Sequence, residues 1–330
     1  MTVPPLFTVV IPTYNQANYL KGAIDSVLAQ SFTDFEIVVV NNYSTDNTRE
    51  VIEAFDDPRI TAMDFSNEGV IGAGRNVGIR AAKGDYVCFL DSDDTWYSEK
   101  LAAVAQVIQN DPEIGLICHN QDMVRDGLVE QKTNYGPPPN YRGKIYDYVL
   151  GAANGPSTSA TTVARSVLED VSGFSEDRAF ITVEDYELWL RLAKVCRFHF
   201  IESILGTHMF HGENSSNNAE RQLNGGLAVL DQIWKELDHP TEDLSLEDHR
   251  RRYRAVRYHR ANAYYVAGRN YQRRGEYKKP LEYYGRTLRI FPLHRKAIMG
   301  LSLLFTDRLL GLRLRRRITG LFWGRSWRWG

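Results

Sequence analysis

The sequence predicts an α/β fold in which a doubly wound, mostly parallel sheet is followed by a helical C-terminal region. Short apolar runs alternate with helical periodicity over about 120 residues, and the pattern beyond about residue 225 is helical. No uncharged apolar stretch reaches the ~18 residues that a membrane-spanning helix needs. We therefore expect two domains, residues 1–225 and 226–330, and no membrane-spanning segment.

The individual elements follow from periodicity and from turn residues. Apolar runs bounded by turn signals predict strands at 7–12, 36–40, 60–65, 86–90 and 114–119. Apolar residues three and four positions apart predict helices at 19–29, 47–55, 71–82 and 99–109. A Pro- and Gly-rich loop at 132–140 precedes a strand at 159–164, helices at 165–171 and 186–194, and a pair of strands at 196–201 and 204–210. Residues 261–292 resemble one tetratricopeptide-like helical hairpin.

Charge is distributed unevenly along the chain, although the net charge is only -1. Residues 251–330 carry 21 Lys and Arg against 3 Asp and Glu, which leaves 19 against 38 in the first 250 residues. Cys88, Cys118 and Cys196 lie far apart, which argues against a disulfide framework and predicts a reducing, cytoplasmic compartment. No basic and apolar leader precedes the first strand, so we expect no signal peptide.

Three carboxylates follow the strand at 86–90 in the segment YVCFLDSDD. Asp91, Asp93 and Asp94 come after the carboxyl end of this strand, where open α/β sheets bind ligands. Closely spaced carboxylates repel one another unless a cation lies among them, and their oxygens suit Mg²⁺ or Mn²⁺. We expect a metal site here, and a solvated acidic turn before a helix is the alternative. For Asp94 the favoured interpretation is a cap of the following helix.

Four segments together resemble the family 2 glycosyltransferases, which have the GT-A fold. They are VVIPTYNQANYL (9–20), SVLAQSFTDFEIVVVNNYSTDNT (26–48), NEGVIGAGRNVGIRAAKGDYVCFLDSDD (67–94) and FITVEDYELWLRLA (180–193). The resemblance covers about residues 5–215 in the family's order. It implies an inverting enzyme that transfers a sugar from a nucleotide-diphosphate sugar to a hydroxyl acceptor, usually with Mg²⁺ or Mn²⁺.

The resemblance also implies which residues perform the chemistry. Asp91 and Asp93 match the family's Asp-x-Asp motif, with Asp93 as the direct metal ligand, and His211 matches a histidine near the metal. Asp185 and the adjacent Glu184 match the catalytic-base position, and we assign the base to Asp185. Such a base takes the proton of the acceptor hydroxyl during attack. Without the resemblance, two acids at a helix start would simply favour the helix dipole.

The donor-binding positions contain one departure from the family. Pro12, Thr13 and Tyr14 match residues that contact the nucleotide, and Arg75 matches an arginine near the donor diphosphate rather than a surface arginine. Asn42 stands where the family usually has an aspartate that pairs with the base ring. An amide donates and accepts whereas a carboxylate only accepts, so the preferred base stays open. The glycines around Arg75 suggest a dinucleotide loop, but they do not follow the first strand, which argues against a nicotinamide site.

The resemblance implies an enzyme of cell-surface polysaccharide or lipid-linked glycan synthesis with a glycan or lipid-linked acceptor. Residues 154–159 are expected on the acceptor side. The alternatives are a catalytically silent sugar-nucleotide-binding protein and a helical adaptor that uses its basic tail. Residues 312–330 interleave arginines with tryptophans and carry no acid. This pattern is typical of a segment that binds an anionic membrane surface, which would place the protein at the inner face of the membrane as a peripheral protein. The alternative is that the segment packs on the acidic part of the same chain. The tail contains no recognised nucleic-acid-binding module.

Overall fold

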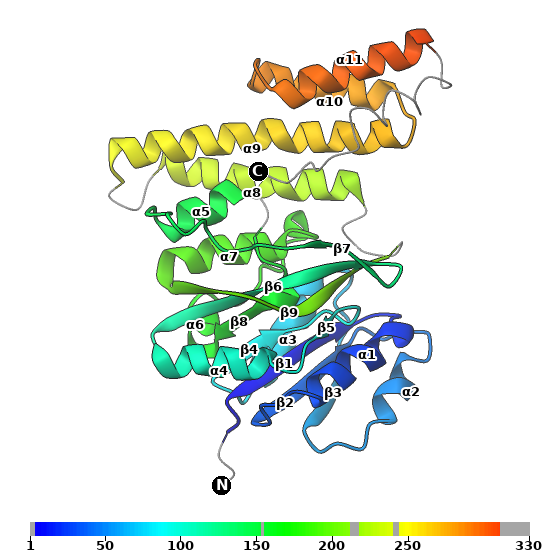
Figure 1. The fold of residues 1–330 in the computed structure, drawn as a ribbon, viewed down its shortest axis with the longest axis vertical. Helices are drawn as coiled ribbons and strands as arrows, with labels where there is room; N and C mark the ends of the chain where they lie inside the picture. Colours follow the sequence, from blue (N-terminus) through cyan, green and yellow to red (C-terminus); the bar gives the residue numbers. More distant parts are fainter. Residues whose placement is uncertain (1–3, 153–154, 212–217, 240–243, 311–330) are drawn as a thin grey trace. The chain divides into compact units, whose positions relative to one another are not determined.

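The computed structural model describes residues 4–152, 155–211, 218–239 and 244–310 (Figure 1). The chain forms two compact units, Met1–Asn217 and Asn218–Gly330. The expected limit at residue 225 lies inside helix α8 (Ala219–Asp238). Asn218 is the N-cap of this helix, and its side chain accepts a hydrogen bond from the N–H of Arg221 at 3.0 Å. The second unit therefore begins where α8 begins.

The described residues of the first unit form a nine-stranded sheet in the order β3-β2-β1-β4-β8-β6-β9-β5, with β7 paired to β6. Four neighbouring strands are parallel: β1 (Phe7–Thr13), β2 (Phe35–Asn41), β3 (Ile60–Asp64) and β4 (Tyr86–Phe89). The antiparallel strand β8 (Thr161–Ala164) lies between β4 and β6 (Ile114–Arg125), and β6 runs parallel to β9 (Arg197–Phe210). The short strands β5 (Thr95–Trp96) and β7 (Leu128–Lys132) pair antiparallel with β9 and β6. One half of the sheet is thus parallel and the other half is mixed.

Helices cover both faces of the parallel half. Apolar side chains of α1 (Ala17–Leu28) and α4 (Lys100–Asn110) belong to one core with the odd-numbered residues of β1 and β2. On the opposite face, Val77 of α3 (Ile71–Ala81) packs with Val38 and Val40 of β2. Gly78 permits this close approach, because a Cβ at that position would lie 2.3 Å from a methyl carbon of Val10. The doubly wound α/β fold predicted from the sequence is confirmed.

The remaining helices of this unit are short, except α7, which carries the predicted base Asp185 in its first turn. Their bounds are α2 (Thr48–Glu53), α5 (Ile145–Ala152), α6 (Arg165–Asp170), α7 (Glu184–Val195) and the 3₁₀ turns Thr158–Ala160 and Arg178–Phe180. The strands expected at 196–201 and 204–210 form the single strand β9, because its pairing with β6 continues through shifts in register. Strands β5 and β7 and helix α5 are not predicted from the sequence. β5 has only two residues, and β7 is exposed at all five positions and shows no apolar alternation.

The described part of the second unit consists of α8, α9 (Leu246–Arg273), α10 (Lys278–Ile290) and α11 (Arg295–Leu310), each packed against the next. The predicted hairpin corresponds to α9 and α10, although α9 begins at Leu246 rather than at 261. The chain turns at Gly275 with φ of +82°, a conformation that glycine adopts readily. The fully buried Tyr284 donates to Oε1 of Gln272 at 2.7 Å. None of the described helices is long and apolar enough to cross a membrane, and residues 312–330 lie outside the described residues.

Candidate active site

The loops that follow β1 and β2 are joined by hydrogen bonds. Asn42 donates its N–H to the carbonyl oxygen of Thr13 at 2.9 Å. The side-chain oxygen of Asn15 accepts the N–H of Thr45 at 2.7 Å. Asn15 and Tyr43 adopt φ angles of 52° and 50°, which non-glycine residues seldom adopt and which cluster at functional sites. Two strand ends that are far apart in the sequence thereby form one edge with a defined shape.

Arg75 is buried at the centre of the predicted site. It donates from Nη2 to Oδ1 of Asp91 at 2.6 Å and from Nη1 to Oε1 of Glu184 at 2.8 Å. Nη2 also lies 3.4 Å from the hydroxyl oxygen of Thr158, and the guanidinium lies 5.3 Å from the ring centre of Phe174. Burial alone would lower the pKa of Arg75, but the charges of Asp91 and Glu184 outweigh it and raise the pKa. The interpretation of Arg75 as a surface helix residue is therefore wrong.

The two acids that open α7 have different surroundings. Glu184 is buried and bound to Arg75 through Oε1, and its Oε2 has no hydrogen-bond partner among the described residues. Asp185 is partly exposed and accepts the N–H of Tyr186 at 2.7 Å. Burial first, and then the charge of Glu184, raise the pKa of Asp185 to about 7, against the opposing effect of Arg75. A carboxyl group that titrates near neutral pH is suited to act as a general base.

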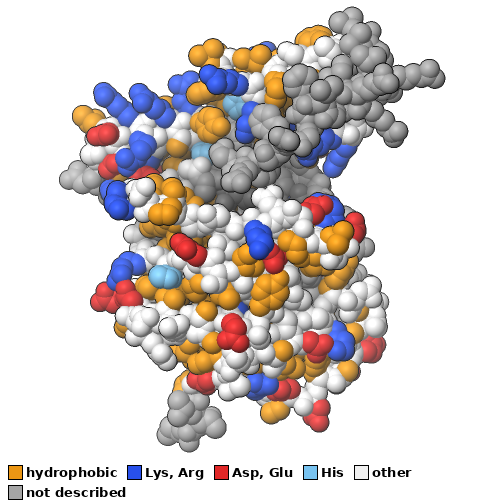
Figure 2. Space-filling model, in the orientation of Figure 1, with side chains coloured by type: hydrophobic (Ala, Val, Ile, Leu, Met, Phe, Trp, Pro, Cys, Tyr) orange, Lys and Arg blue, Asp and Glu red, His pale blue; other side chains and the backbone are white. Residues whose placement is uncertain are grey.

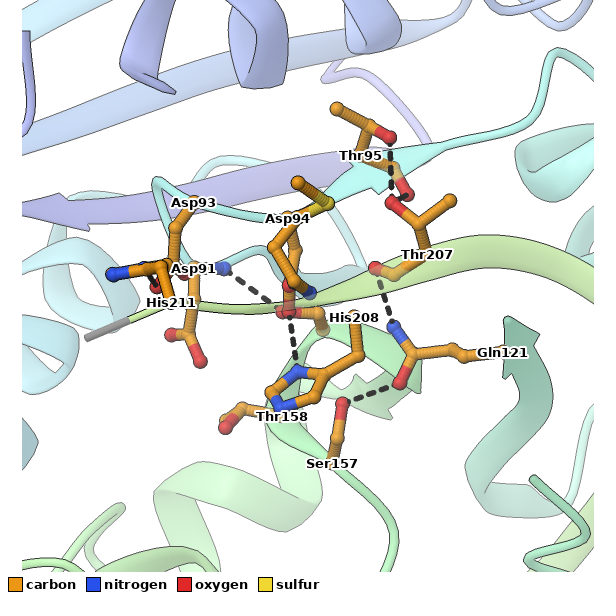
Figure 3. Close-up of polar contacts among 12 residues, drawn as sticks. Asp91, Asp93, Asp94, Thr95, Gln121, Ser157, Thr158, Thr207, His208 and His211 are labelled. Atoms are coloured by element: carbon orange, nitrogen blue, oxygen red, sulfur yellow. Dashed lines mark hydrogen bonds and ion pairs between the residues drawn. The ribbon is translucent and has the colours of Figure 1, made fainter. Parts of the chain in front are cut away.

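Asp93 lies beside the predicted histidine. Oδ2 of Asp93 and Nε2 of His211 are 2.8 Å apart (Figure 3), and the ring of Tyr19 stacks on His211 with centroids 4.7 Å apart. Burial first, and then the charges of Asp94 and Asp91, raise the pKa of Asp93 to about 6. The carboxylates are therefore crowded enough to repel one another, and a bound cation would relieve this repulsion.

Asp94 does not cap the following helix. Its Oδ1 accepts the N–H of Met209 at 2.8 Å, and its Oδ2 lies 3.2 Å from Nδ1 of His208 (Figure 3). Helix α4 begins at Lys100 with Glu99 as its N-cap, so the capping interpretation of Asp94 is wrong. Burial would lower the pKa of His208, but the hydrogen bond to Asp94 and its charge raise it to about 9. Asp94 therefore connects the acidic segment to β9 and favours a positive charge on His208.

The predicted donor residues lie at the ends of β1 and β2. Pro12 and Thr13 are buried at the end of β1, and the hydroxyl of Thr13 has no hydrogen-bond partner among the described residues. Tyr14 is 54% exposed just beyond them. The side-chain oxygen of Asn42 accepts the N–H of Asn67 at 2.9 Å. Because that oxygen already accepts a hydrogen bond, the NH₂ of the Asn42 side chain is the group that would donate to a ligand.

Some polar residues of the site carry no signal in the sequence. The N–H of Asp91 donates to the hydroxyl of Ser159 at 3.0 Å, so Thr158 and Ser159 contact the Arg75–Asp91 pair. Nearby, Ser157 donates to Oε1 of Gln121 at 2.7 Å (Figure 3). Residues 154–159 are predicted to lie on the acceptor side, and residue 154 lies outside the described residues. His208 and Gln121 have no flanking motif that identifies them.

The fit of a metal rests on the chemistry of Asp93 and His211. A carboxylate oxygen and an imidazole nitrogen side by side suit Mn²⁺, whereas Mg²⁺ prefers oxygen ligands. The described residues contain no group of three or more His, Cys, Asp and Glu side chains arranged to hold a metal ion. Such incomplete sites are usual where water and the oxygens of a phosphate substrate supply the remaining ligands. The residues present therefore fit a divalent ion that binds together with a phosphate substrate.

Sequence comparison identifies a family and several relatives. The sequence model of "Glycosyl transferase family 2" matches residues 8–171. An uncharacterized glycosyltransferase of Rickettsia felis is 32% identical over 227 residues, covering 64% of this chain and 35% of the relative. The uncharacterized glycosyltransferase alr2836 of Nostoc sp. is 37% identical over 172 residues, covering 50% of this chain and 52% of the relative. The chondroitin synthase of Pasteurella multocida is 30% identical over 232 residues, covering 69% of this chain and 23% of the relative. The chain thus spans about half or less of the length of these relatives.

Solved structures show the same fold. S. aureus TarS 1-349 in complex with UDP-GlcNAc has a TM-score of 0.65 and 19% identity, covering 98% of this chain and 93% of that one. The mannosyltransferase PcManGT from Pyrobaculum calidifontis, in complex with GDP-Man and Mn²⁺, has a TM-score of 0.56 and 16% identity, covering 98% and 89%. At these identities the likeness concerns the fold, in agreement with the α/β fold and C-terminal helices expected from the sequence.

Proposed function

The chain belongs to the family 2 glycosyltransferases, and from this premise we propose that it is an inverting enzyme that moves a sugar from a nucleotide-diphosphate sugar to a hydroxyl acceptor. The observation that carries the proposal is the position of the buried Arg75, which binds Asp91 after β4 and Glu184 at the start of α7. One guanidinium thus connects the acidic segment with the helix that carries Asp185. The TarS complex with UDP-GlcNAc supports a nucleotide-sugar donor.

In the proposed reaction, Asp185 removes the proton of the acceptor hydroxyl as that oxygen attacks the sugar. A carboxyl pKa of about 7 leaves a large fraction ionised at neutral pH and keeps it basic enough to accept a proton. Glu184 contributes to this value through its negative charge and is itself held in place by Arg75. Asp185 is therefore the proposed catalytic base, and Glu184 and Arg75 position it.

The donor would bind at the ends of β1, β2 and β4. The buried hydroxyl of Thr13, the exposed ring of Tyr14 and the NH₂ group of Asn42 are the groups proposed to contact the nucleotide. Asp93 and His211, together with Asp91, would hold Mg²⁺ or Mn²⁺. Such an ion neutralises the charge that develops on the diphosphate leaving group. The PcManGT complex with GDP-Man and Mn²⁺ supports this assignment.

The proposed acceptor is a growing glycan or a lipid-linked saccharide of cell-surface polysaccharide synthesis. The similarity to the chondroitin synthase of Pasteurella multocida supports a polysaccharide role. A lipid-linked acceptor would require the enzyme to work at the cytoplasmic surface of a membrane, as a peripheral protein. The Arg- and Trp-rich segment 312–330 suggested this location, but it lies outside the described residues.

The test is donor hydrolysis and sugar transfer with a panel of UDP, GDP, dTDP and CDP sugars, with and without Mn²⁺. We expect turnover of one donor class, and losses of at least about a hundredfold for Asp185→Asn and Asp93→Ala. The matched control is Asp25→Asn, since Asp25 is an exposed carboxylate of α1 whose side chain pairs with the exposed Lys21. Full activity of either site variant would refute its assigned role. Donor binding without any turnover would favour the catalytically silent sugar-nucleotide-binding protein instead.

A further inference from the structure

The second unit exposes a set of large apolar side chains around the turn between α10 and α11. Leu293 in this turn is 80% exposed, and Ile298 and Phe305 on α11 are 44% and 49% exposed. Tyr258 on α9 and Phe291 at the end of α10 are also exposed, and their rings lie 5.8 Å apart. We call this surface the α11 face, and it consists of Tyr258, Phe291, Leu293, Ile298, Met299 and Phe305.

The α11 face is separate from the packing of α11 within its own unit. Ala297 and Leu304 are buried, and Gly300 lies so close to Tyr284 that a Cβ would be 2.7 Å from its ring. Ile298 and Phe305 each follow one of these two buried residues in the sequence, so they lie on a neighbouring face of the helix, and both are exposed. Outer helices of stacked helical units ordinarily carry a polar outer surface. Several exposed large apolar side chains on such a helix therefore indicate an interaction site.

Positive charge surrounds the α11 face. Residues 249–275 and 283–306 contain no Asp or Glu. Arg257, Arg289 and Arg295 are exposed, and Arg257 is fixed beside Phe291 by donation to the carbonyl oxygen of Ile290 at 3.1 Å. Figure 2 shows blue and orange side chains next to one another on the helices of this unit. The α11 face thus combines exposed apolar side chains with exposed arginines, and residues 251–330 contain only three acids, Glu276, Glu282 and Asp307.

This combination identifies the kind of partner. A second copy that used the same face would bring two sets of arginines together, which electrostatic repulsion disfavours. An anionic bilayer offers negative headgroups to the arginines and an apolar interior to Leu293, Ile298 and Phe305. Tyr258 has the apolar ring and polar hydroxyl that suit the boundary between these two layers. We propose that the α11 face binds the surface of an anionic membrane.

The inference deepens the peripheral location given under the proposed function. Its test is sedimentation of the full chain with vesicles of phosphatidylcholine alone and of phosphatidylcholine with phosphatidylglycerol, at low and high salt. This measurement uses neither donor nor acceptor, so its failure would leave the proposed transfer reaction untouched. The variant is Ile298→Ser with Phe305→Ser, and the control is Leu128→Ser with Val129→Ser, which removes two exposed apolar side chains of β7 in the first unit.

We expect the wild-type chain to sediment with anionic vesicles and to be released by salt, because salt screens the arginines. The α11 variant should bind at least about tenfold more weakly, because it loses two apolar side chains that would enter the bilayer. The control variant should bind as the wild type does. Equal binding of the α11 variant and the wild type, or no binding of the wild type, would overturn the proposal. A wild-type dimer that the α11 variant converts to a monomer would assign the face to a second copy instead.

Discussion

The substitution Asp185→Asn is expected to increase the stability of the protein at alkaline pH while it lowers the rate of sugar transfer. The pKa of Asp185 is raised from 3.8 to about 7, chiefly by burial. A carboxyl group whose pKa is raised by folding contributes stability that is fully present below its unfolded pKa of about 4 and is lost as the pH rises through about 7. At pH 8 the folded protein therefore bears the full cost of an ionised Asp185, and an asparagine at this position bears none.

The magnitude follows from the size of the shift. Each pKa unit corresponds to about 1.4 kcal/mol, so a shift of this size gives an upper value of about 4 kcal/mol. Asp185 is partly exposed, and solvent screening reduces the expected gain to about 2 kcal/mol at pH 8. At pH 4 the gain should be close to zero, because the carboxyl group is then protonated in the folded state. Removal of a general base should at the same time lower the transfer rate by about 10² to 10⁴.

The assay is urea denaturation of the wild type and of Asp185→Asn at pH 4 and pH 8, with tryptophan fluorescence as the measure of unfolding. Glu187→Gln on the same helix is the matched control. Glu187 is buried and receives two hydrogen bonds from Arg191, both at 2.8 Å, so its loss should destabilise the protein by about 2 kcal/mol at pH 8. The reasoning is refuted if Asp185→Asn shows no gain at pH 8, or the same gain at both pH values.

Three further predictions concern other buried or site residues. Arg75→Met should lower the free energy of unfolding by about 3 to 5 kcal/mol in urea denaturation, because Asp91 and Glu184 lose their shared partner. A decrease of less than about 1 kcal/mol would contradict the role of these buried ion pairs. Lys100→Met should stabilise the protein by about 1 kcal/mol or more, because burial lowers the pKa of the ammonium group, whose contacts are the Thr162 hydroxyl, the ring face of Trp96 and the sulfur of Cys88, and no carboxylate is among them. Destabilisation would contradict this account. Asn42→Asp should bind UDP about tenfold more tightly than the wild type in calorimetry. The reason is that a carboxylate can accept a hydrogen bond from the N–H of the nucleotide base as well as from the N–H of Asn67. Unchanged affinity would place Asn42 outside the base-binding site.

Local sequence determined the alternating half of the fold. The strands at 7–12, 36–40 and 86–90 were predictable because buried parallel strands are short apolar runs between turn residues, whereas β3, in the segment 60–65, has no buried residue. Helices α1 and α4 were predictable because one face of each is apolar at helical spacing, whereas α3 is buried at every position from Gly72 to Ile79. Asp91 and Asp93 could be placed near a ligand site because parallel strands end at the same edge of a sheet.

Tertiary structure alone decided which side chains meet at that edge. Arg75 pairs with Glu184, Asp94 with His208 and Asp93 with His211, over separations of 109, 114 and 118 residues. The sequence could not distinguish Asp94 as a helix cap from Asp94 as the partner of His208, because both interpretations need the same residue in the same local pattern. Local sequence sets the period of burial, whereas the charge and pKa of a side chain depend on neighbours that only the folded chain brings within a few ångströms.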